Sequence, residues 1–186
     1  MATELNIADI QKYISNRIEP ALIGDNDIAG IVGDGPSSYS KSPGLWNAAF
    51  GHLGMNAIYL PFDVDDKRLG DLLSTLKSSD RFIGINVTVP HKVRVIDFLD
   101  ELDSGALPIQ AVNTIVRTAD GKLIGYNTDG EGFIQSILTP QPGRRDSFVG
   151  TLGGTDVLLL GAGGSARAVA FHLAELLDRG QLLICN

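Results

Sequence analysis

An apolar run that leads into a glycine-rich turn constrains the fold of this chain more than any other feature. The run covers residues 157–160 and is followed at once by Gly161-Ala162-Gly163-Gly164-Ser165-Ala166. A buried strand that feeds such a turn and then a helix is the way in which a Rossmann-type dinucleotide-binding domain begins. Such a domain needs more than about 100 residues, and the given residues end at Asn186. We therefore expect only an N-terminal fragment of that domain, preceded by a complete domain.

Composition and charge narrow the class of protein. The 186 residues are 44% hydrophobic and carry a net charge of -7, which argues against general affinity for nucleic acid because phosphates call for clustered Lys and Arg. A few local donors can still bind small anions. The sequence has no run of about 18 apolar residues, no basic-then-apolar signal at its start and a single cysteine, Cys185. We expect a cytoplasmic protein that binds small molecules, with no nucleic acid or membrane partner.

Apolar periodicity and turn residues predict strands that alternate with helices. The expected strands cover residues 28–33, 57–64, 82–89, 111–117, 122–125, 156–160 and 181–185. The expected helices cover residues 5–18, 42–53, 66–78, 91–102, 128–138 and 163–178. The proline- and glycine-rich segment 139–155 is expected to be a linker. This pattern predicts an α/β fold, with a mainly parallel sheet covered by helices on both faces over residues 1–138 and the start of a Rossmann-type domain over 156–186.

Polar residues follow the predicted strands, at the edge where open α/β sheets bind ligands. Ser40 and Ser42 lie beside the expected helix start, where they either hold a carboxylate or only shape a turn and cap the helix. Asn86 and Thr88 end a buried-type strand. Lys92 stands at the head of the next expected helix, where a cation opposes the helix dipole. Such a locally unfavourable placement favours a functional role for Lys92.

Three further polar residues carry weaker signals. Asn113 lies inside an otherwise apolar strand and needs hydrogen-bond partners, which either the protein or a ligand supplies. Asp129 begins a predicted helix, where a carboxylate is either a partner of the helix dipole or a functional group. His91 is expected to cap its helix or to pack. We expect no metal site.

Together, these groups and the glycine turn resemble the shikimate dehydrogenase family. Five motifs occur in the family's order: Ser40-Lys41-Ser42-Pro43, Asn86-Val87-Thr88-Val89-Pro90-His91-Lys92, Ala111-Val112-Asn113-Thr114, Gly125-Tyr126-Asn127-Thr128-Asp129-Gly130 and Gly161-Ala162-Gly163-Gly164. Each motif alone is modest, but five in this order are highly specific. The resemblance runs from Ile28 to Asn186, and residues 1–27 look like an N-terminal extension helix.

The resemblance implies an NADP-dependent oxidoreductase that reversibly reduces 3-dehydroshikimate to shikimate, in the biosynthesis of chorismate and the aromatic amino acids. Residues 1–138 would then be the substrate-binding catalytic domain and 156–186 a fragment of the NADP-binding domain. By this resemblance the substrate carboxylate would be held by Ser40 and Ser42, and the ring hydroxyls would be bound by Asn86, Thr88, Asn113 and Asp129. Lys92 would be the catalytic residue, which either donates a proton or stabilises the developing alkoxide. Asp129, if it pairs with Lys92, would orient the ammonium.

The resemblance also implies a cofactor site. Gly161 would make the tight turn, Gly163 would let the backbone approach the pyrophosphate, and Gly164 or Ser165 would open the helix, with Ala162 and Ala166 in the same run. Asn186 stands where NAD enzymes tend to place Asp or Glu. It resembles the first residue of the family's Asn-Arg-Thr motif, whose arginine binds the 2′-phosphate of NADP.

Some features depart from the family pattern or leave alternatives open. Tyr126 and Gln110 replace residues that are more usual there. The given residues include no counterpart of the family's C-terminal helix with its glutamine contact, so we expect the chain alone to be inactive. One alternative is a quinate or dual quinate/shikimate dehydrogenase, in which Thr often replaces the residue at Ser42. Another is a non-enzymatic ligand sensor, against which Lys92 and Asp129 argue. A third is another two-domain dehydrogenase, such as a folate dehydrogenase.

Overall fold

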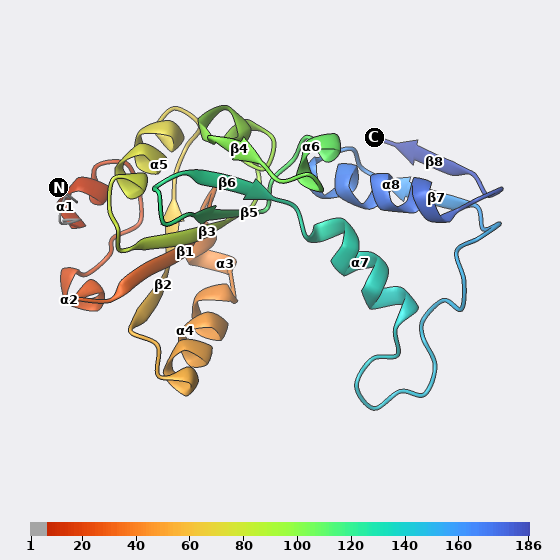
Figure 1. Cartoon of the computed structure of the whole chain (residues 1–186), viewed down its shortest axis with the longest axis horizontal. Helices are drawn as coiled ribbons and strands as arrows, with labels where there is room; N and C mark the ends of the chain where they lie inside the picture. The colour runs from red at the N-terminus through yellow and green to blue at the C-terminus, as the bar shows by residue number, and fades with distance from the viewer. Residues whose placement is uncertain (1–6) are drawn as a thin grey trace. The chain divides into compact units, whose positions relative to one another are not determined.

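The computed structural model describes residues 7–186, which form two compact units (Figure 1). The first unit comprises the chain up to Asp103 together with Val112–Tyr126, and the second comprises Ser104–Ala111 and Asn127–Asn186. The expected boundary after Leu138 therefore does not coincide with the division into compact units. Helix α7 (Asp129–Leu138) packs against α8 (Gly164–Leu176), and both helices belong to the second unit.

A six-stranded sheet in the order β2-β1-β3-β5-β6-β4 is the centre of the first unit. Its strands are β1 (Asp27–Gly33), β2 (Ala57–Asp63), β3 (Phe82–Val87), β4 (Glu101–Leu102), β5 (Thr114–Arg117) and β6 (Leu123–Tyr126). Strand β5 pairs antiparallel with both of its neighbours, whereas the other pairs of adjacent strands are parallel. The predicted mainly parallel sheet is confirmed.

Helices cover both faces of this sheet, as predicted (Figure 1). Helix α4 (Ser42–Leu53) covers one face, and α1 (Ile7–Gln11), α5 (Leu69–Lys77) and the 3-10 helix η1 (Arg94–Phe98) cover the other. The apolar stripe of α5 is at most 1% exposed and consists of Leu69, Leu72, Leu73 and Leu76. Because both faces are covered, β1 is buried along almost all of its length.

Two asparagine side chains satisfy the outer backbone groups of β2, which lies at one edge of the sheet. The Asn47 side chain accepts the N–H of Tyr59 at 2.7 Å and donates to its carbonyl at 2.9 Å. Asn16 donates to the carbonyl of Pro61 at 2.9 Å and accepts the N–H of Asp63 at 2.8 Å. Proline is tolerated in β2 because an edge strand does not need every N–H for its ladder. An edge closed in this way is a poor template for pairing with another chain.

The predicted helix over 5–18 is wrong beyond Gln11, and residues 5 and 6 lie outside the described residues. Ile10, Ile14 and Ile18 are buried, as their spacing requires, but α1 ends at Gln11. The Gln11 side chain then fixes a turn by donating to the carbonyl of Asn16 at 2.8 Å and accepting the N–H of Ile18 at 3.1 Å. The turn brings Asn16 to β2, so the edge of the sheet determines this segment rather than its helical periodicity.

The predicted helix over 91–102 is also wrong. Only the 3-10 turn η1 forms there, and β4 follows it. The N–H of Asp100 donates to the carbonyl of Leu123 at 3.0 Å, and that of Asp103 donates to Gly125 at 2.9 Å. The backbone of this segment therefore pairs with β6 instead of continuing a helix. Three one-turn helices were not expected: α2 (Pro20–Ile23), α3 (Pro36–Tyr39) and α6 (Ala106–Ile109).

The second unit holds the predicted strand–helix–strand. Strands β7 (Val157–Leu160) and β8 (Leu182–Cys185) pair in parallel, and α8 connects them. A small core of Ile134, Leu152, Leu173 and Leu177 joins α7 to α8. Leu152 lies within the expected linker 139–155, and the N–H of Val149 donates to Ile137 at 2.9 Å. Part of that segment is therefore packed rather than a free connection.

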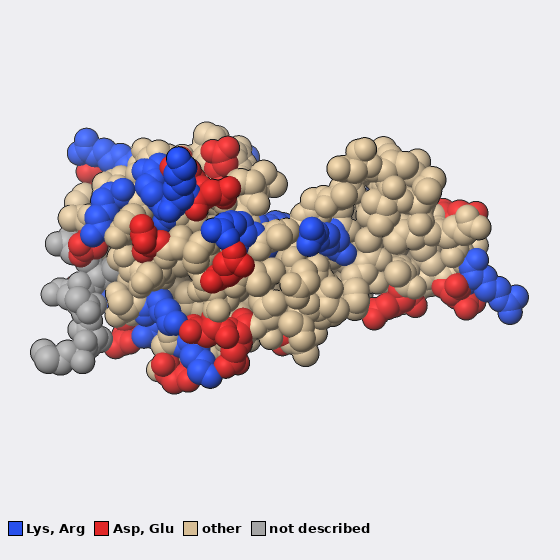
Figure 2. Space-filling model, turned by 90° about the horizontal axis from the view of Figure 1, so that it is seen from above, with Lys and Arg blue, Asp and Glu red and all other residues tan. Residues whose placement is uncertain are grey.

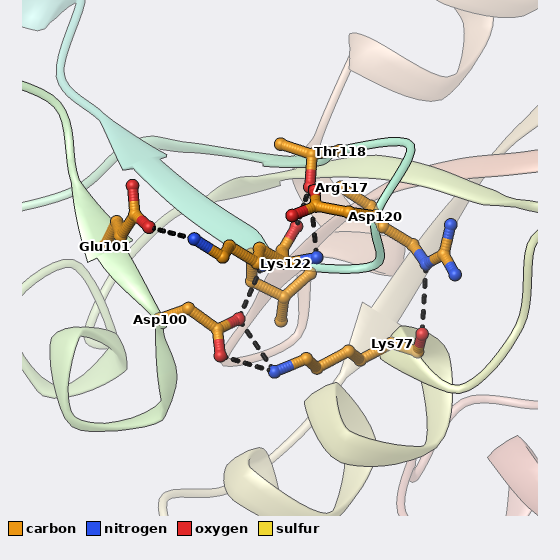
Figure 3. Close-up of polar contacts among 8 residues, drawn as sticks. Lys77, Asp100, Glu101, Arg117, Thr118, Asp120 and Lys122 are labelled. Atoms are coloured by element: carbon orange, nitrogen blue, oxygen red, sulfur yellow. Dashed lines mark hydrogen bonds and ion pairs between the residues drawn. The ribbon is translucent and has the colours of Figure 1, made fainter.

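Charged side chains link α5, β4 and the β5–β6 hairpin at the surface of the first unit (Figure 3). The Lys77 ammonium lies 2.6 and 2.7 Å from the two carboxylate oxygens of Asp100. The same carboxylate accepts the N–H of Leu123 at 2.6 Å. The pKa of Asp100 is lowered, first by the hydrogen bond from Leu123 and then by Lys77. Because its pKa is lower in the folded chain, the ionised Asp100 carboxylate stabilises the fold at pH values above its unfolded-state pKa. This stabilisation is lost as the pH falls through the folded-state pKa.

We expect Asp100→Asn to reduce the free energy of unfolding at pH 7 by at most about 1 kcal/mol, because the ion pair is largely exposed. The difference from the unaltered chain should shrink at about pH 3, where the carboxyl groups of the unfolded chain become protonated. Urea unfolding at both pH values measures it. Asp97→Asn, which removes an exposed pair with Arg94, is the control, and an equal loss in both variants would contradict the expectation.

Candidate functional site

The first group of candidate residues lies where β1 leaves the sheet. A Cβ atom at Gly33 would stand 2.4 Å from Cγ2 of Thr88, so only glycine fits where the end of β1 meets Thr88. The chain then passes through α3 to Ser40. The Ser40 hydroxyl oxygen accepts the N–H of Ser42 at 3.2 Å. Ser42 is the first residue of α4 and not its cap, so the predicted capping role is wrong.

The second group follows β3. The N–H of Thr88 donates to Val32 at 2.9 Å, which ties this segment to β1, and the carbonyl of Thr88 accepts the N–H of His91 at 2.9 Å. The carbonyl of Lys92 accepts the N–H of Val112 at 2.7 Å. Lys92 lies in a turn rather than at the head of an α-helix. The argument from the helix dipole therefore fails, although Lys92 is placed close to the segment that carries Asn113.

Asn113 lies just before β5, between β3 and β6. Its carbonyl accepts the N–H of Val87 at 2.7 Å, and its own N–H donates to Tyr126 at 3.0 Å. The expected position inside a strand is therefore shifted by one residue, because β5 begins at Thr114. Asn113 is thereby held at the same edge of the sheet as Asn86 and Thr88.

A chain of hydrogen bonds connects two of the candidate residues. The Tyr59 hydroxyl donates to Oδ1 of Asn86 at 2.6 Å. Nδ2 of Asn86 donates to Oγ1 of Thr114 at 3.1 Å. Thr114 in turn donates to Oδ1 of Asn113 at 3.0 Å. The structure thus brings Asn86 and Asn113 into one polar cluster with Tyr59 and Thr114.

Tyr59 and Thr114 are the two members of this cluster that the sequence reasoning missed. Tyr59 is only 3% exposed, and its burial raises the pKa of the phenol, while the contact with Ser42 opposes the shift. A buried phenol usually finds a hydrogen-bond partner. The single tyrosine in the apolar strand β2 was the available signal. Thr114 belongs to the motif Ala111-Val112-Asn113-Thr114 but received no role, because threonine is ordinary in a strand.

A cavity of about 240 Å³ lies beside this cluster in the first unit. Trp46 and Phe50 of α4 and Ile83 of β3 line its apolar wall, and Asn86 and Thr114 lie at its polar border. The pocket can bury an apolar ring face while amide and hydroxyl groups meet its polar edge. Such a combination of apolar walls with a few placed polar groups is typical of small-molecule sites.

His91 is buried and plays a structural part, as expected. It is fully buried, with Nε2 at 2.8 Å from the carbonyl of Val64. Because a carbonyl only accepts, Nε2 is the protonated nitrogen of the ring. Nδ1 lies 2.9 Å from the carboxylate of Asp66. His91 therefore fixes the turn that precedes Lys92 against the end of β2.

In the second unit, Asp129 is the first residue of α7. Its N–H donates to Oδ1 of Asn127 at 3.0 Å, and its carboxylate accepts a hydrogen bond from the Ser165 hydroxyl at 3.1 Å. Gly130 permits this arrangement, because a Cβ atom there would lie 2.4 Å from the carbonyl oxygen of Ala168. The close crossing of α7 and α8 thus places a predicted catalytic carboxylate beside the glycine turn.

The glycine turn has the conformation that its sequence predicts. Gly161 has a φ of +106°, a region that L side chains rarely adopt, and makes the turn out of β7. Gly163 precedes α8, and no side chain caps this helix start. An added Cβ atom at Gly163 would meet open space. Backbone N–H groups at such a helix start can bind a phosphate. Asn186 follows β8 and is exposed.

Three further features concern the charges, the possible metal ligands and the helix lengths of the described residues. Acidic and basic side chains are interspersed on the face seen in Figure 2 and do not gather into a patch of one sign. Among residues 7–186, no group of three or more His, Cys, Asp or Glu side chains is placed to hold a metal ion. No helix in this described part of the chain is long and apolar enough to cross a bilayer.

Comparisons with known proteins agree with this architecture. Residues 31–115 match the family model described as the shikimate dehydrogenase substrate binding domain. The NADP(+) shikimate dehydrogenase of Lysinibacillus sphaericus is 43% identical over 145 residues, which cover 78% of this chain and 49% of that protein. The chain spans about half the length of the curated relatives it matches.

Solved structures give the same result. A shikimate dehydrogenase crystallised with NADP+ superposes with a TM-score of 0.74 at 38% identity, over 87% of this chain and 51% of that one. Shikimate 5-dehydrogenase from Thermus thermophilus, solved with NADP(H) and shikimate, gives 0.68 at 32% identity, over 84% and 54%. The fold defines an α/β protein whose second unit begins like a Rossmann-type domain. Within that class, the chain matches the shikimate dehydrogenase family over most of its own length.

Gly130 and Gly132 provide a matched pair of substitutions in α7. We expect Gly130→Ala to loosen the contact between α7 and α8 by at least about 1 kcal/mol, because the new methyl group would meet backbone of α8. Gly132→Ala should stabilise α7 by up to about 1 kcal/mol, since nothing lies within 4 Å of its added Cβ. Hydrogen exchange of the α7 and α8 amides measures both effects. Equal protection in the two variants would contradict the close crossing.

Proposed function

We propose that this chain supplies the substrate-binding unit and the beginning of the cofactor-binding unit of an NADP-dependent shikimate dehydrogenase. Such an enzyme reversibly reduces 3-dehydroshikimate to shikimate. The hydrogen-bonded chain from Tyr59 through Asn86 to Asn113 carries the proposal. It lies in a region that matches the family's substrate binding domain. Hydroxyl and amide groups at such spacing suit a ring that bears several hydroxyl groups.

The substrate carboxylate is assigned to Ser40 and Ser42. Their hydroxyl groups lie at the start of α4, where the backbone N–H groups of the first helical turn add further donors. A site of this kind holds an anion without a neighbouring cation. Asn86, Thr88 and Asn113 are assigned to the ring hydroxyls, because amides and hydroxyls both donate and accept hydrogen bonds. These assignments are consistent with the common edge of the sheet at which all five residues lie.

Lys92 is assigned to proton transfer. The bound nicotinamide cofactor supplies the hydride that is added to the carbonyl carbon of the substrate. The Lys92 ammonium donates a proton to the carbonyl oxygen, which balances the negative charge that develops there. In the reverse direction the neutral amine accepts this proton from the alcohol. Asp129 is assigned to orient the ammonium and to bind a ring hydroxyl.

The glycine turn suits a dinucleotide. The positive φ of Gly161 and the open space beside Gly163 leave the start of α8 accessible to a pyrophosphate. Ser165 and Asn186 complete the proposed NADP contacts within this chain, together with Ala162, Gly164 and Ala166. The presence of Asn186 rather than an acidic residue favours NADP over NAD, because NAD enzymes use a carboxylate there to bind the ribose 2′-hydroxyl.

Binding of shikimate by the chain tests the substrate assignment. We expect a dissociation constant below about 1 mM, with weaker binding of quinate, measured by isothermal titration calorimetry. Ser40→Ala and Ser42→Ala should each weaken binding at least about 10-fold, because each removes a hydrogen bond to a charged group. Ser38→Ala, whose hydroxyl donates only locally to Gly35, is the control. Failure of the unaltered chain to bind shikimate would overturn the proposal.

Lys92→Ala should lower kcat at least about 100-fold and leave the affinity for shikimate nearly unchanged, because proton transfer matters only in the transition state. The measurement is steady-state reduction of 3-dehydroshikimate by NADPH, in a protein that joins this chain to a complete nucleotide-binding domain. Lys67→Ala, at an exposed position, should leave turnover unchanged. Near-normal turnover of Lys92→Ala would refute the assigned role.

A further inference from the structure

Tyr59 is held from several sides, although it has no assigned role in the site. Its ring is 3% exposed and stacks on Trp46 with centroids 6.0 Å apart and planes at 13°. Its backbone N–H and carbonyl are both bound by the side chain of Asn47. Strand β2 and helix α4 thus fix the place of the Tyr59 hydroxyl before any ligand arrives.

The hydrogen bonds of this hydroxyl have a definite direction. A phenol has one proton to give, and the hydroxyl donates it to Oδ1 of Asn86 at 2.6 Å. Any further hydrogen bond of this hydroxyl is therefore one that its oxygen accepts. The direction continues beyond Asn86, because Nδ2 donates to Thr114 at 3.1 Å and Thr114 donates to Asn113 at 3.0 Å.

This directed chain restricts the side-chain amide of Asn86. Suppose that the Asn86 amide rotated so that its oxygen and nitrogen changed places, while its neighbours stayed as they are. Its NH2 group would then face the Tyr59 proton, and its oxygen would face a Thr114 hydroxyl that already donates to Asn113. Both hydrogen bonds would be lost, and in a half-buried site such unsatisfied groups are costly. The orientation of Asn86 can therefore change only if the whole chain reverses.

We propose that Tyr59 is a positioning residue of the substrate site, whose hydroxyl fixes the amide of Asn86 in the orientation that meets a ring hydroxyl of the substrate. The inference rests on the proposed function, because it assigns Asn86 to substrate binding. Tyr59 itself does not need to touch the substrate. Its effect passes through Asn86, to which the Tyr59 hydroxyl donates its proton.

The test is the affinity for shikimate, measured by calorimetry on Tyr59→Phe. This variant keeps the ring, its stacking on Trp46 and the backbone contacts with Asn47, so the fold is preserved. We expect binding about 10-fold weaker than in the unaltered chain, which corresponds to one hydrogen bond. Tyr13→Phe, a partly buried tyrosine of the same unit, is the matched control and should bind within about 2-fold of the unaltered chain.

A double-mutant cycle separates positioning from a general loss of packing. In the background of Asn86→Ala, Tyr59→Phe should change the dissociation constant by less than about 2-fold, since Asn86 is no longer there to be positioned. Thr114→Val, which breaks the chain on the other side of Asn86, should weaken binding to a similar degree as Tyr59→Phe. An equal effect of Tyr59→Phe in both backgrounds would overturn the inference.

A spectroscopic measurement reports on Asn86 directly. The two side-chain amide protons of Asn86 should shift in the NMR spectrum of ligand-free Tyr59→Phe and stay in place in Tyr13→Phe. The positioning role alone would be refuted by Asn86 signals that do not change in Tyr59→Phe. It would also be refuted if the unaltered chain binds shikimate and Tyr59→Phe binds it with the same affinity. Absence of shikimate binding by the unaltered chain would instead refute the proposed function, and the inference would fall with it.

Discussion

The close approach of β1 and β3 at their carboxyl ends is the constraint on which the candidate site depends. Thr88 occupies the space that a side chain at Gly33 would need, and its N–H donates to Val32 at 2.9 Å. The N–H of Asp34 donates to Val89 at 3.0 Å. Because the two backbones are locked together here, the loops that follow them start from a common point. Thr88 and the turn that carries Lys92 are therefore held beside the end of β1.

The sequence was informative about the site where polar residues interrupt apolar runs. Asn86 and Asn113 stand out for this reason. The antiparallel pairing of β3 with β5 brings them together, because the end of β3 lies beside the start of β5. Tyr59 gives a weaker signal, because tyrosine is common in strands and only its place in an otherwise apolar strand marks it. Its partner Asn86 is 27 positions away in the sequence. Only the register of β2, β1 and β3 brings the two side chains together, and no local pattern encodes that register.

Both wrong helix predictions concern segments that lie at the two edges of the same sheet. At one edge, Asn16 leaves the helical pattern to satisfy the backbone of β2. At the other, Asp100 and Asp103 donate their N–H groups to β6. An edge strand exposes a row of unpaired backbone groups, and satisfying them outweighs a marginal helix propensity. Periodicity still predicted burial correctly, since Ile10, Ile14 and Ile18 are all inside. It could not predict the backbone conformation, which depends on strands far away in the sequence.

The first unit contains two kinds of polar network, an ionic one around Asp100 and a neutral one through Tyr59 and Asn86. The network around Asp100 consists of exposed ion pairs. Such pairs contribute little to stability, because water and salt screen them. The network through Tyr59 and Asn86 consists of neutral groups, and its buried members are shielded from water. Each hydrogen bond in it therefore has a fixed donor and a fixed acceptor.

A carboxylate in the place of these neutral groups would repel an anionic substrate, and an arginine would bind anions of many shapes. Neutral hydroxyls and amides instead select a ligand by the positions of its hydroxyl groups, since a ligand that lacks one leaves a buried partner unsatisfied. Under the proposed function, selection of a hydroxylated acid would follow from the direction of these hydrogen bonds rather than from the charge of the protein.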